Sequence, residues 1–281
     1  MKANSELGTH DEFRNVTDWD PDTAVSWANA LEMRANAPEQ QKLRQILLGL
    51  AQAQKGDMVV EIGCGTGMLL CDLARAVGST GYVIGIEPQP VLAEAARQKL
   101  AEKGFNSFTE VRSERAERLS IPDHVVSACL AQTVLIHLPG DVLDQCFREM
   151  VRVLEPGGRV VSADQDGDTW IIDHPDRELT RSIVRFNSDQ RYADGWTGRR
   201  LLRKFRESSL HDVKIESFLH VDVSRSSYLF AMAERIALAA AEADVISYDD
   251  ATKWVNGLHE LGAQGHFFSS INYYVAVGVW N

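Results

Sequence analysis

Short apolar runs alternate with amphipathic segments between residues 38 and 163, and this alternation predicts β-α-β units. Strands, marked by runs rich in β-branched residues, are expected at 58–62, 82–86, 108–111, 125–131 and 159–163. Helices, marked by apolar residues at helical spacing, are expected at about 38–54, 68–77, 91–103 and 142–154. Strands and helices in this order form a mostly parallel sheet with helices on both faces.

The second half of the chain is less regular. Residues 165–193 form a polar excursion with scattered aromatics, and the elements expected after it are a helix at 196–207, a strand at 213–218, helices at 228–243 and 251–261, and a β-rich run at 267–280. A terminal strand that follows such an excursion suggests an antiparallel last strand. Because no Pro/Gly/Ser-rich linker divides the halves, we expect one Rossmann-like α/β domain over 38–281. Residues 1–37 would form an N-terminal lid segment, with a helical cap from insertions at about 165–195 and 225–262.

Composition limits the kinds of molecule that the protein is expected to bind and the compartment in which it is expected to work. The net charge of −11 argues against a nucleic-acid partner, which would require a basic surface. The chain has no run of about 18 apolar residues and no apolar region near Met1, so neither a membrane span nor a signal peptide is expected. Its four cysteines are scattered, which favours buried thiols in a reducing cytoplasm over a disulfide framework or a metal site.

The segment 59–67 (VVEIGCGTG) carries the clearest chemical signal. A β-branched run ends in Glu61, glycines follow at 63, 65 and 67, and an apolar helix begins at Met68. Glycines suit a sharp turn off a strand where a ligand approaches the backbone. Dinucleotide sites favour G-x-G-x-x-G, which would need a glycine where Met68 stands. The E-x-G-x-G-x-G pattern instead resembles motif I of the class I S-adenosylmethionine (SAM)-dependent methyltransferases, although such a loop also occurs at other nucleotide sites or as a plain turn.

The resemblance extends over about 59–163. Glu87 ends the second strand twenty residues after Gly67, where an acidic side chain can accept both ribose hydroxyls. Segment 115–123 (RAERLSIPD) resembles the family's D-A-E-x-L-P-F-P-D signature, and 154–159 (LEPGGR) resembles its R-V-L-x-P-G-G turn. The chain departs from the signature at Arg115, where the family commonly has an aspartate for the adenine amino group. Either Glu114 or the backbone around Ala116 would then make that contact.

The pattern is most similar to the small-molecule methyltransferases related to ubiquinone/menaquinone biosynthesis. The segment 196–201 (WTGRRL) is also similar to that group, although the motif is weak and an ordinary helix start is the favoured interpretation. The resemblance implies a seven-stranded sheet with an antiparallel last strand. It also implies SAM as cofactor, with Arg34 a candidate for the cofactor carboxylate. The predicted cofactor residues are Arg34, Glu61, Gly63, Cys64, Gly65, Gly67, Glu87, Pro88, Glu114, Arg115, Ala116, Ala131 and Gln132.

Methyl transfer from a sulfonium needs alignment and water exclusion more than covalent help, and it needs a base only when the acceptor atom carries a proton. His137, in the loop after the fourth strand, is the candidate base, and packing of that loop is its alternative role. Asp164, at the end of the fifth strand, is a second candidate if it faces the pocket, the alternative being a solvated turn. No metal site is expected. Predicted substrate-contacting residues are Trp19, Trp27, Asp166, Trp170, His174, Tyr192 and Trp196.

These patterns predict a cytoplasmic SAM-dependent methyltransferase that modifies an O or N nucleophile of a small, partly aromatic metabolite, as in natural product biosynthesis. Two alternatives stay open: a C-methyltransferase of the quinone type, and a protein of this fold that binds SAM without methyl transfer, such as a cyclase. The acceptor, the pathway and the oligomeric state, with a homodimer as one option, are not determined by the sequence.

Overall fold

The computed structural model describes residues 10–281. Within this range eight strands form one sheet in the order β3-β2-β1-β4-β5-β8-β6, with β7 also paired to β8. The strands are β1 (Met58–Ile62), β2 (Tyr82–Ile86), β3 (Thr109–Arg112), β4 (Val126–Gln132), β5 (Leu154–Gln165), β6 (Ile171–Ile172), β7 (His211–Asp222) and β8 (Ser269–Val279). Strands β1 to β5 are parallel, while β8 runs antiparallel to β5, β6 and β7. The predicted Rossmann-like fold is confirmed, with the two-residue β6 as an addition to the expected seven strands.

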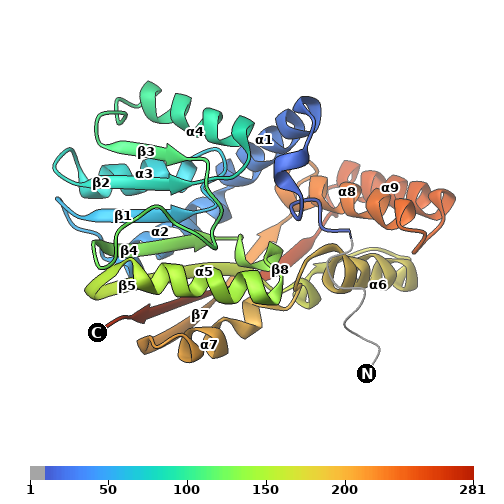
Figure 1. Cartoon of the computed structure of the whole chain (residues 1–281). Helices are drawn as coiled ribbons and strands as arrows, with labels where there is room; N and C mark the ends of the chain where they lie inside the picture. The colour runs from blue at the N-terminus through green and yellow to red at the C-terminus, as the bar shows by residue number, and fades with distance from the viewer. Residues whose placement is uncertain (1–9) are drawn as a thin grey trace.

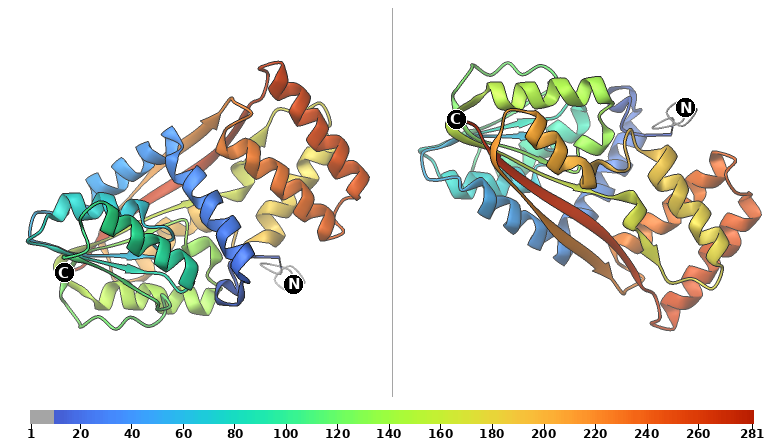
Figure 2. Two further views of the ribbon diagram at one scale, coloured as in Figure 1. Left: turned by 90° about the horizontal axis from the view of Figure 1, so that it is seen from above. Right: turned by 90° about the horizontal axis from the view of Figure 1, so that it is seen from below.

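Helices cover both faces of the sheet (Figures 1 and 2). The helices are α1 (Pro21–Asn36), α2 (Pro38–Ala51), α3 (Met68–Val77), α4 (Pro90–Glu102), α5 (Gly140–Arg152), α6 (Arg177–Phe186), α7 (Thr197–Glu207), α8 (Tyr228–Glu242) and α9 (Tyr248–Ala263). Helices α2, α3 and α4 lie on one face, and α5 and α7 lie on the other. Most observed bounds lie within three residues of those predicted, because the apolar periodicity of these elements is strong.

Two helices were not predicted as individual elements. Helix α1 lies in the N-terminal segment that was expected only as a lid, and α6 lies in the insertion at about 165–195, which was expected as part of a helical cap without helix bounds. Both carry cap signals, since Asp20 accepts a hydrogen bond from the backbone N–H of Thr23 and Asp176 accepts one from that of Leu179. Helix α1 also has a proline at its first position. These short-range signals mark where each helix begins, although α1 lacks a clear apolar stripe.

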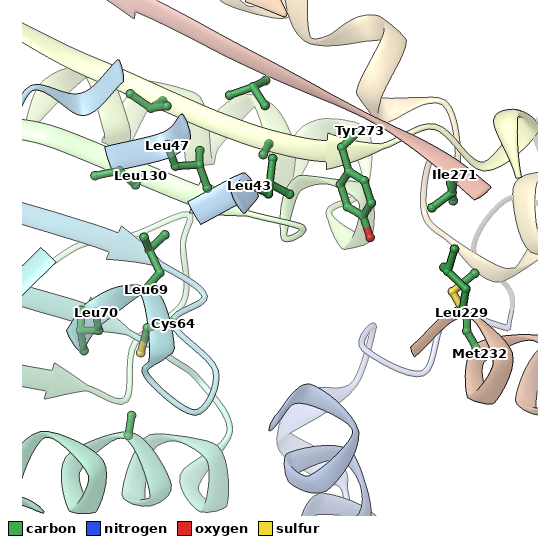
Figure 3. Close-up of a cluster of buried hydrophobic side chains, with 14 of the residues drawn as sticks. Leu43, Leu47, Cys64, Leu69, Leu70, Leu130, Leu229, Met232, Ile271 and Tyr273 are labelled. Atoms are coloured by element: carbon green, nitrogen blue, oxygen red, sulfur yellow. The ribbon is translucent and has the colours of Figure 1, made fainter. Parts of the chain in front are cut away.

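The long strands β7 and β8 extend past the end of the parallel sheet and carry the cap formed by α6, α8 and α9 (Figures 1 and 2). The apolar core continues into this cap. In Figure 3, Leu229 and Met232 of α8 lie near Ile271 of β8, and all three belong to the cluster that contains Leu43 and Leu70 beside the sheet. Apolar side chains of the cap and of the sheet are therefore buried together. This packing holds the cap beside the carboxyl edge of the strands.

Candidate functional site

A cavity of about 380 Å³ opens at the carboxyl ends of β1, β2, β4 and β5. Its size falls in the range of small-molecule sites, about 300–1,000 Å³. Open α/β sheets bind ligands at this edge because the strand order reverses there, here between β1 and β4. Residues 13–16, helix α1 and residues of the cap complete the walls. The cavity therefore joins segments from the beginning, middle and end of the chain.

The glycine loop forms one side of this cavity. Gly63, Gly65 and Gly67 have φ of 64°, 52° and 82°, in the left-handed region that favours glycine. A Cβ at position 63 would lie 2.4 Å from a methyl of Val134, and one at position 67 would lie 3.0 Å from Cβ of Ala96. The loop thus brings backbone close to the cavity and ends at the N-terminus of α3, where donors are available to a ligand.

Glu87 lies against this loop at the end of β2. Its Oε2 accepts a hydrogen bond from the N–H of Gly65 at 2.9 Å, and its Oε1 accepts one from the N–H of Gln89 at 3.0 Å. Burial raises the pKa of the Glu87 carboxyl to about 7, although these two N–H groups act in the opposite direction. A buried carboxylate at this position can accept the hydroxyl pair of a ribose.

Glu61 lies on the floor of the cavity at the end of β1. It is 3% exposed, and its Oε2 has no hydrogen-bond partner among residues 10–281. Burial raises the pKa of this carboxyl well above its ordinary value, Asp72 adds to the rise, and Arg44 opposes it. An unpartnered buried acceptor is costly unless a ligand satisfies it, and the ammonium group of a bound amino acid would do so.

The loop after β4 forms the opposite side. Thr133 has φ of 54°, a left-handed conformation that is strained for a β-branched residue. Its hydroxyl donates to the carbonyl of Gln132 at 2.7 Å and accepts a hydrogen bond from Arg34 of α1. Gln132 in turn donates to Gln40 of α2 at 3.1 Å. Arg34 is therefore held at the cavity by the residue that follows β4.

The other predicted cofactor residues divide into two groups. Those that line the cavity are Cys64, Pro88, Arg115 and Ala116. Gly67, Ala131 and Glu114 lie outside the lining. Gly67 packs against α4, Ala131 is buried in β4, and Glu114 accepts a hydrogen bond from the N–H of Ser120. Of the two options for the adenine contact, the segment at Ala116 therefore fits the geometry better than Glu114.

His137 lines the cavity and is paired with Asp11 from the N-terminal segment. Nδ1 of His137 lies 2.9 Å from Oδ1 and 3.1 Å from Oδ2 of Asp11, whose side chain is 2% exposed. Asp11 also accepts hydrogen bonds from the N–H groups of Phe13 and Ala193. With Nδ1–H directed at this carboxylate, Nε2 carries the lone pair that can take a proton. The sequence did not identify Asp11, because 126 residues separate it from His137.

Asp164 does not face the cavity, which corrects the expectation of a second base. It is fully buried at the end of β5, and its Oδ1 accepts a hydrogen bond from the N–H of Ile136 at 3.3 Å. Burial raises the pKa of its carboxyl to about 8. Since Ile136 belongs to the helical turn Leu135–His137, Asp164 supports the loop that carries His137.

Of the predicted substrate contacts, Trp27 and Tyr192 line the cavity. The other five lie outside the lining because each has a structural partner elsewhere. Trp19 stacks on Trp27 with ring centroids 5.9 Å apart, Trp170 donates to Ser269, His174 contacts the carbonyl of Trp254, Asp166 binds Arg199, and the exposed ring of Trp196 lies under Arg199 and Arg200.

Several lining residues carry no local sequence signal. Phe13 contacts both His137 and Trp27, with ring centroids 4.5 and 4.8 Å apart. Arg191 follows α6, and Tyr228 and Arg235 lie on α8. Arginines and tyrosines on helices are usually surface residues, so nothing in the pattern distinguished these three. Only the docking of the cap turns them toward the cavity.

One group near the cavity has the composition of a metal site. Ligand atoms of Glu39, His220 and Asp222 lie within 4.8 Å of one another. Most of the polar atoms of this group have partners in the protein: Lys42 pairs with Glu39, Gln40 bonds His220 Nδ1, and Asp222 Oδ2 accepts from the N–H of Leu229. His220 Nε2 lies 3.2 Å from Asp222 Oδ2 but makes no hydrogen bond within residues 10–281. The arrangement therefore fits a link between α2, β7 and α8.

The fold, with its cavity at the carboxyl edge of the sheet, resembles that of the class I methyltransferases, and comparison with known proteins agrees. Residues 59–158 match a family model described as a methyltransferase domain. An uncharacterized 37.1 kDa protein in transposon TN4556 of Streptomyces fradiae is 27% identical over 249 residues, which are 88% of this chain and 69% of that protein. A demethylmenaquinone methyltransferase of Desulfitobacterium hafniense is 34% identical over 113 residues, which are 40% of this chain and 44% of that enzyme.

The fold is also found in solved structures. That of geranyl diphosphate C-methyltransferase from Streptomyces coelicolor, in complex with S-adenosyl-L-homocysteine, has a TM-score of 0.53 at 15% identity and covers 86% of this chain and 76% of that one. The likeness to the quinone methyltransferase spans less than half of that enzyme. These comparisons confirm the predicted resemblance to the class I SAM-dependent methyltransferases. In the part of the chain that the structure describes, no helix is long and apolar enough to cross a membrane.

Proposed function

We propose that this protein transfers the methyl group of SAM to an oxygen or nitrogen nucleophile of a small organic acceptor and releases S-adenosylhomocysteine. The observation that carries this proposal is the cradle at the carboxyl edge of the sheet. It combines the left-handed glycine loop, the buried carboxyl of Glu87 beside that loop and the unpartnered oxygen of Glu61 on the cavity floor. These groups match a nucleoside that carries an amino acid.

The residues of the cradle fit SAM along its whole length. Glu87 would accept the ribose hydroxyls, Glu61 Oε2 would accept the methionine ammonium, and Arg34 would bind the methionine carboxylate. The backbone around Ala116 would border the adenine. SAM, when bound, supplies a methyl group on a positively charged sulfur. The protein then has to align the acceptor with that methyl and exclude water.

His137 is the base in this proposal, and Asp11 positions it. The hydrogen bond to Asp11 holds the imidazole with Nε2 available, so that Nε2 can take the proton of a hydroxyl or amine acceptor as the methyl group is transferred. This assignment favours O- or N-methylation over C-methylation. Phe13 and Tyr192 contact the His137 ring, at 4.5 and 5.4 Å between centroids, and keep its surroundings largely apolar.

The shape of the site favours a small, partly aromatic acceptor over a macromolecule. Aromatic rings of Phe13, Trp27 and Tyr192 line the acceptor side, where they can stack on a flat molecule. In our proposal residues 10–37 act as a lid, and the insertions at about 165–195 and 225–262 form the acceptor side of the domain over 38–281. The first nine residues of the predicted lid segment 1–37 lie outside the described residues. The four buried free thiols suit the cytoplasmic location that we propose.

The first test is calorimetric titration of the full chain with SAM, S-adenosylhomocysteine and, as a control ligand, NAD. We expect both sulfur ligands to bind at micromolar concentration, NAD not to bind, and Glu87→Ala to weaken the sulfur ligands at least tenfold. Glu94→Ala, on the exposed surface of α4, is the matched control and should bind as the wild type does. If a folded, ligand-free preparation binds neither sulfur ligand, the proposal fails.

The second test asks whether His137 acts as a base or only packs the loop after β4. Acceptors are screened with methyl-labelled SAM, and His137→Ala is then compared with the wild type on the best acceptor. We expect turnover to fall at least hundredfold with cofactor affinity within twofold, since general bases contribute about 10²–10⁴-fold. A loss of tenfold or less would remove His137 as base and favour a C-methyl acceptor. Cofactor binding without transfer to any acceptor would instead favour a protein that uses the SAM fold for other chemistry.

A further inference from the structure

Two arginines from the cap converge on the acceptor side of the cavity. Arg191 ends the helical turn after α6, and its side chain is 5% exposed. Arg235 projects from α8, and both residues line the cavity. The Nε atoms of both are buried and have no hydrogen-bond partner within residues 10–281. A buried N–H donor without a partner is costly, so these two Nε atoms point to a ligand.

The remaining contacts of the two side chains offset the charge of Arg191 in part and leave that of Arg235 without a carboxylate partner among the described residues. Arg191 donates to the hydroxyl of Tyr192 at 2.8 Å and lies 3.3 Å from a carboxylate oxygen of Glu12. The guanidinium of Arg235 lies 4.6 Å from the ring centroid of Trp27 and makes no ion pair with any carboxylate in the described range. Its neighbour Glu234 is paired with His259 instead.

Comparison with two other arginines of the lining, Arg44 and Arg34, strengthens this point. Arg44, which is also buried, has Asp72 at 3.0 Å and the carbonyl of Ala35 at 2.6 Å. Arg34 is bound to Thr133, at the end of β4, on the side that the proposed function gives to the methionine carboxylate. Arg235 therefore differs from both, because aromatic contact replaces a hydrogen-bonded partner.

Aromatic contacts connect this charge to the candidate base. Arg235 lies over Trp27, Trp27 contacts Phe13, and Phe13 contacts His137. On the other side, Arg191 bonds Tyr192, whose ring contacts that of His137. The Arg191 and Arg235 charges both lower the pKa of the Tyr192 phenol, which burial raises, so the two guanidiniums lie near the same side chain. A ligand group held by them would lie one or two side chains from His137.

We propose that Arg191 and Arg235 bind an oxyanion group of the acceptor, a carboxylate or a phosphate, and that the acceptor is therefore an organic anion. The inference rests on the proposed function, which places the cofactor on the opposite wall. Guanidinium groups bind carboxylate and phosphate through paired N–H donors, and such charge-assisted bonds are strong in a buried site. The flat face of Trp27 beside Arg235 would contact the carbon skeleton next to the anionic group.

The test uses the full chain saturated with S-adenosylhomocysteine at constant ionic strength. Three probes are titrated: benzoate, phenyl phosphate, and benzamide as a neutral match for benzoate. The variants are Arg235→Gln and, as a matched control, Arg206→Gln on the exposed face of α7. We expect at least one anion to bind the wild type tenfold or more tightly than benzamide. The tighter of the two anions identifies the group as carboxylate or phosphate.

Arg235→Gln should weaken that anion at least tenfold and change benzamide by less than twofold, whereas Arg206→Gln should change neither. Equal affinity for anions and benzamide, an equal loss of both in Arg235→Gln, or no anion binding to the loaded protein would overturn the inference. The preceding titration with S-adenosylhomocysteine is read separately. Failure at that step would count against the proposed cofactor, while failure at the anion step would count only against the anionic acceptor.

Discussion

The two walls of the cavity are built by different means. Most of the proposed cofactor wall lies within residues 61–87, as strand ends, a glycine loop and two carboxyls, and Arg34 and Ala116 complete it. The acceptor wall consists of large side chains from the N-terminal segment, α1, the turn after α6, and α8. The first wall depends on backbone geometry that a sheet imposes locally. The second depends on how a lid and a cap dock on that sheet.

Because of this difference, the two walls tolerate amino-acid substitutions to different degrees. A backbone cradle has little tolerance, because a single Cβ alters the path of the chain. A wall of side chains can be exchanged residue by residue while the fold persists, which suits a fold that serves many acceptors. We therefore expect substitutions in the glycine loop to abolish cofactor binding, and substitutions in the acceptor wall to alter turnover or specificity.

The largest effect is expected for Gly63→Ala. The new Cβ would lie 2.4 Å from a methyl of Val134 in a backbone with φ of 64°, so the loop has to move. Affinity for S-adenosylhomocysteine should fall at least hundredfold in calorimetry. Gly104→Ala is the matched control, with φ of 74° and nothing within 4 Å of its Cβ. If both variants kept wild-type affinity, the cofactor wall would not depend on close backbone approach.

On the acceptor wall, Asp11→Asn tests the positioning of His137. The Asn side chain has only one acceptor oxygen, and its NH₂ group can face Nδ1 instead. The tautomer that carries its proton on Nδ1 and its lone pair on Nε2 then becomes less populated. Turnover of the acceptor found by screening should fall about tenfold to hundredfold, with the affinity for S-adenosylhomocysteine unchanged. Asp22→Asn, exposed on α1, is the control. A loss of cofactor affinity in Asp11→Asn would show that the walls are not independent.

The pH dependence of cofactor binding tests Glu87. Its pKa of about 7 means that the carboxyl is largely protonated at pH 6 and ionised at pH 8, and the ionised form accepts ribose hydroxyls better. Affinity for S-adenosylhomocysteine should be about tenfold lower at pH 6 than at pH 8. The variant Glu87→Gln should bind more weakly at pH 8 and lose most of this dependence. A wild-type affinity that does not change with pH would contradict the assignment.

The last prediction concerns stability and not binding, at Asp164 beneath the loop that carries His137. Because burial raises the pKa of its carboxyl to about 8, above the unfolded value of about 3.9, the folded state binds its proton more tightly. Its contribution to stability is fully present below about pH 4 and is lost as the pH rises through 8. The steepest loss is about 1.4 kcal/mol per pH unit.

The Asp164→Asn variant lacks this titration, so its free energy of unfolding should fall less between pH 5 and pH 8 than that of the wild type. Urea unfolding at four pH values measures the difference. Asp141→Asn, exposed on α5, should keep the wild-type slope. Identical slopes in wild type and Asp164→Asn would mean that this carboxyl is ionised in the folded protein across the range.

The sequence by itself determined the parallel sheet, its antiparallel end and the glycine loop that lines the cavity. Strand β1, the glycines and the start of α3 are consecutive, and Glu87 ends the strand that pairs directly with β1. Periodicity and local turn chemistry are sufficient for such features, because the residues involved are neighbours in the chain or lie on paired strands. Helix α1 was missed because its cap signals were not combined with a clear apolar stripe.

Tertiary structure alone decided the acceptor wall. It paired Asp11 with His137 across 126 residues, placed Arg235 over Trp27, and turned Asp164, Trp170 and Trp196 away from the cavity. No periodicity in the sequence predicts these contacts, because each depends on where the lid and the cap dock. That docking is driven by apolar burial, which is non-directional and does not specify which polar side chains end up facing each other.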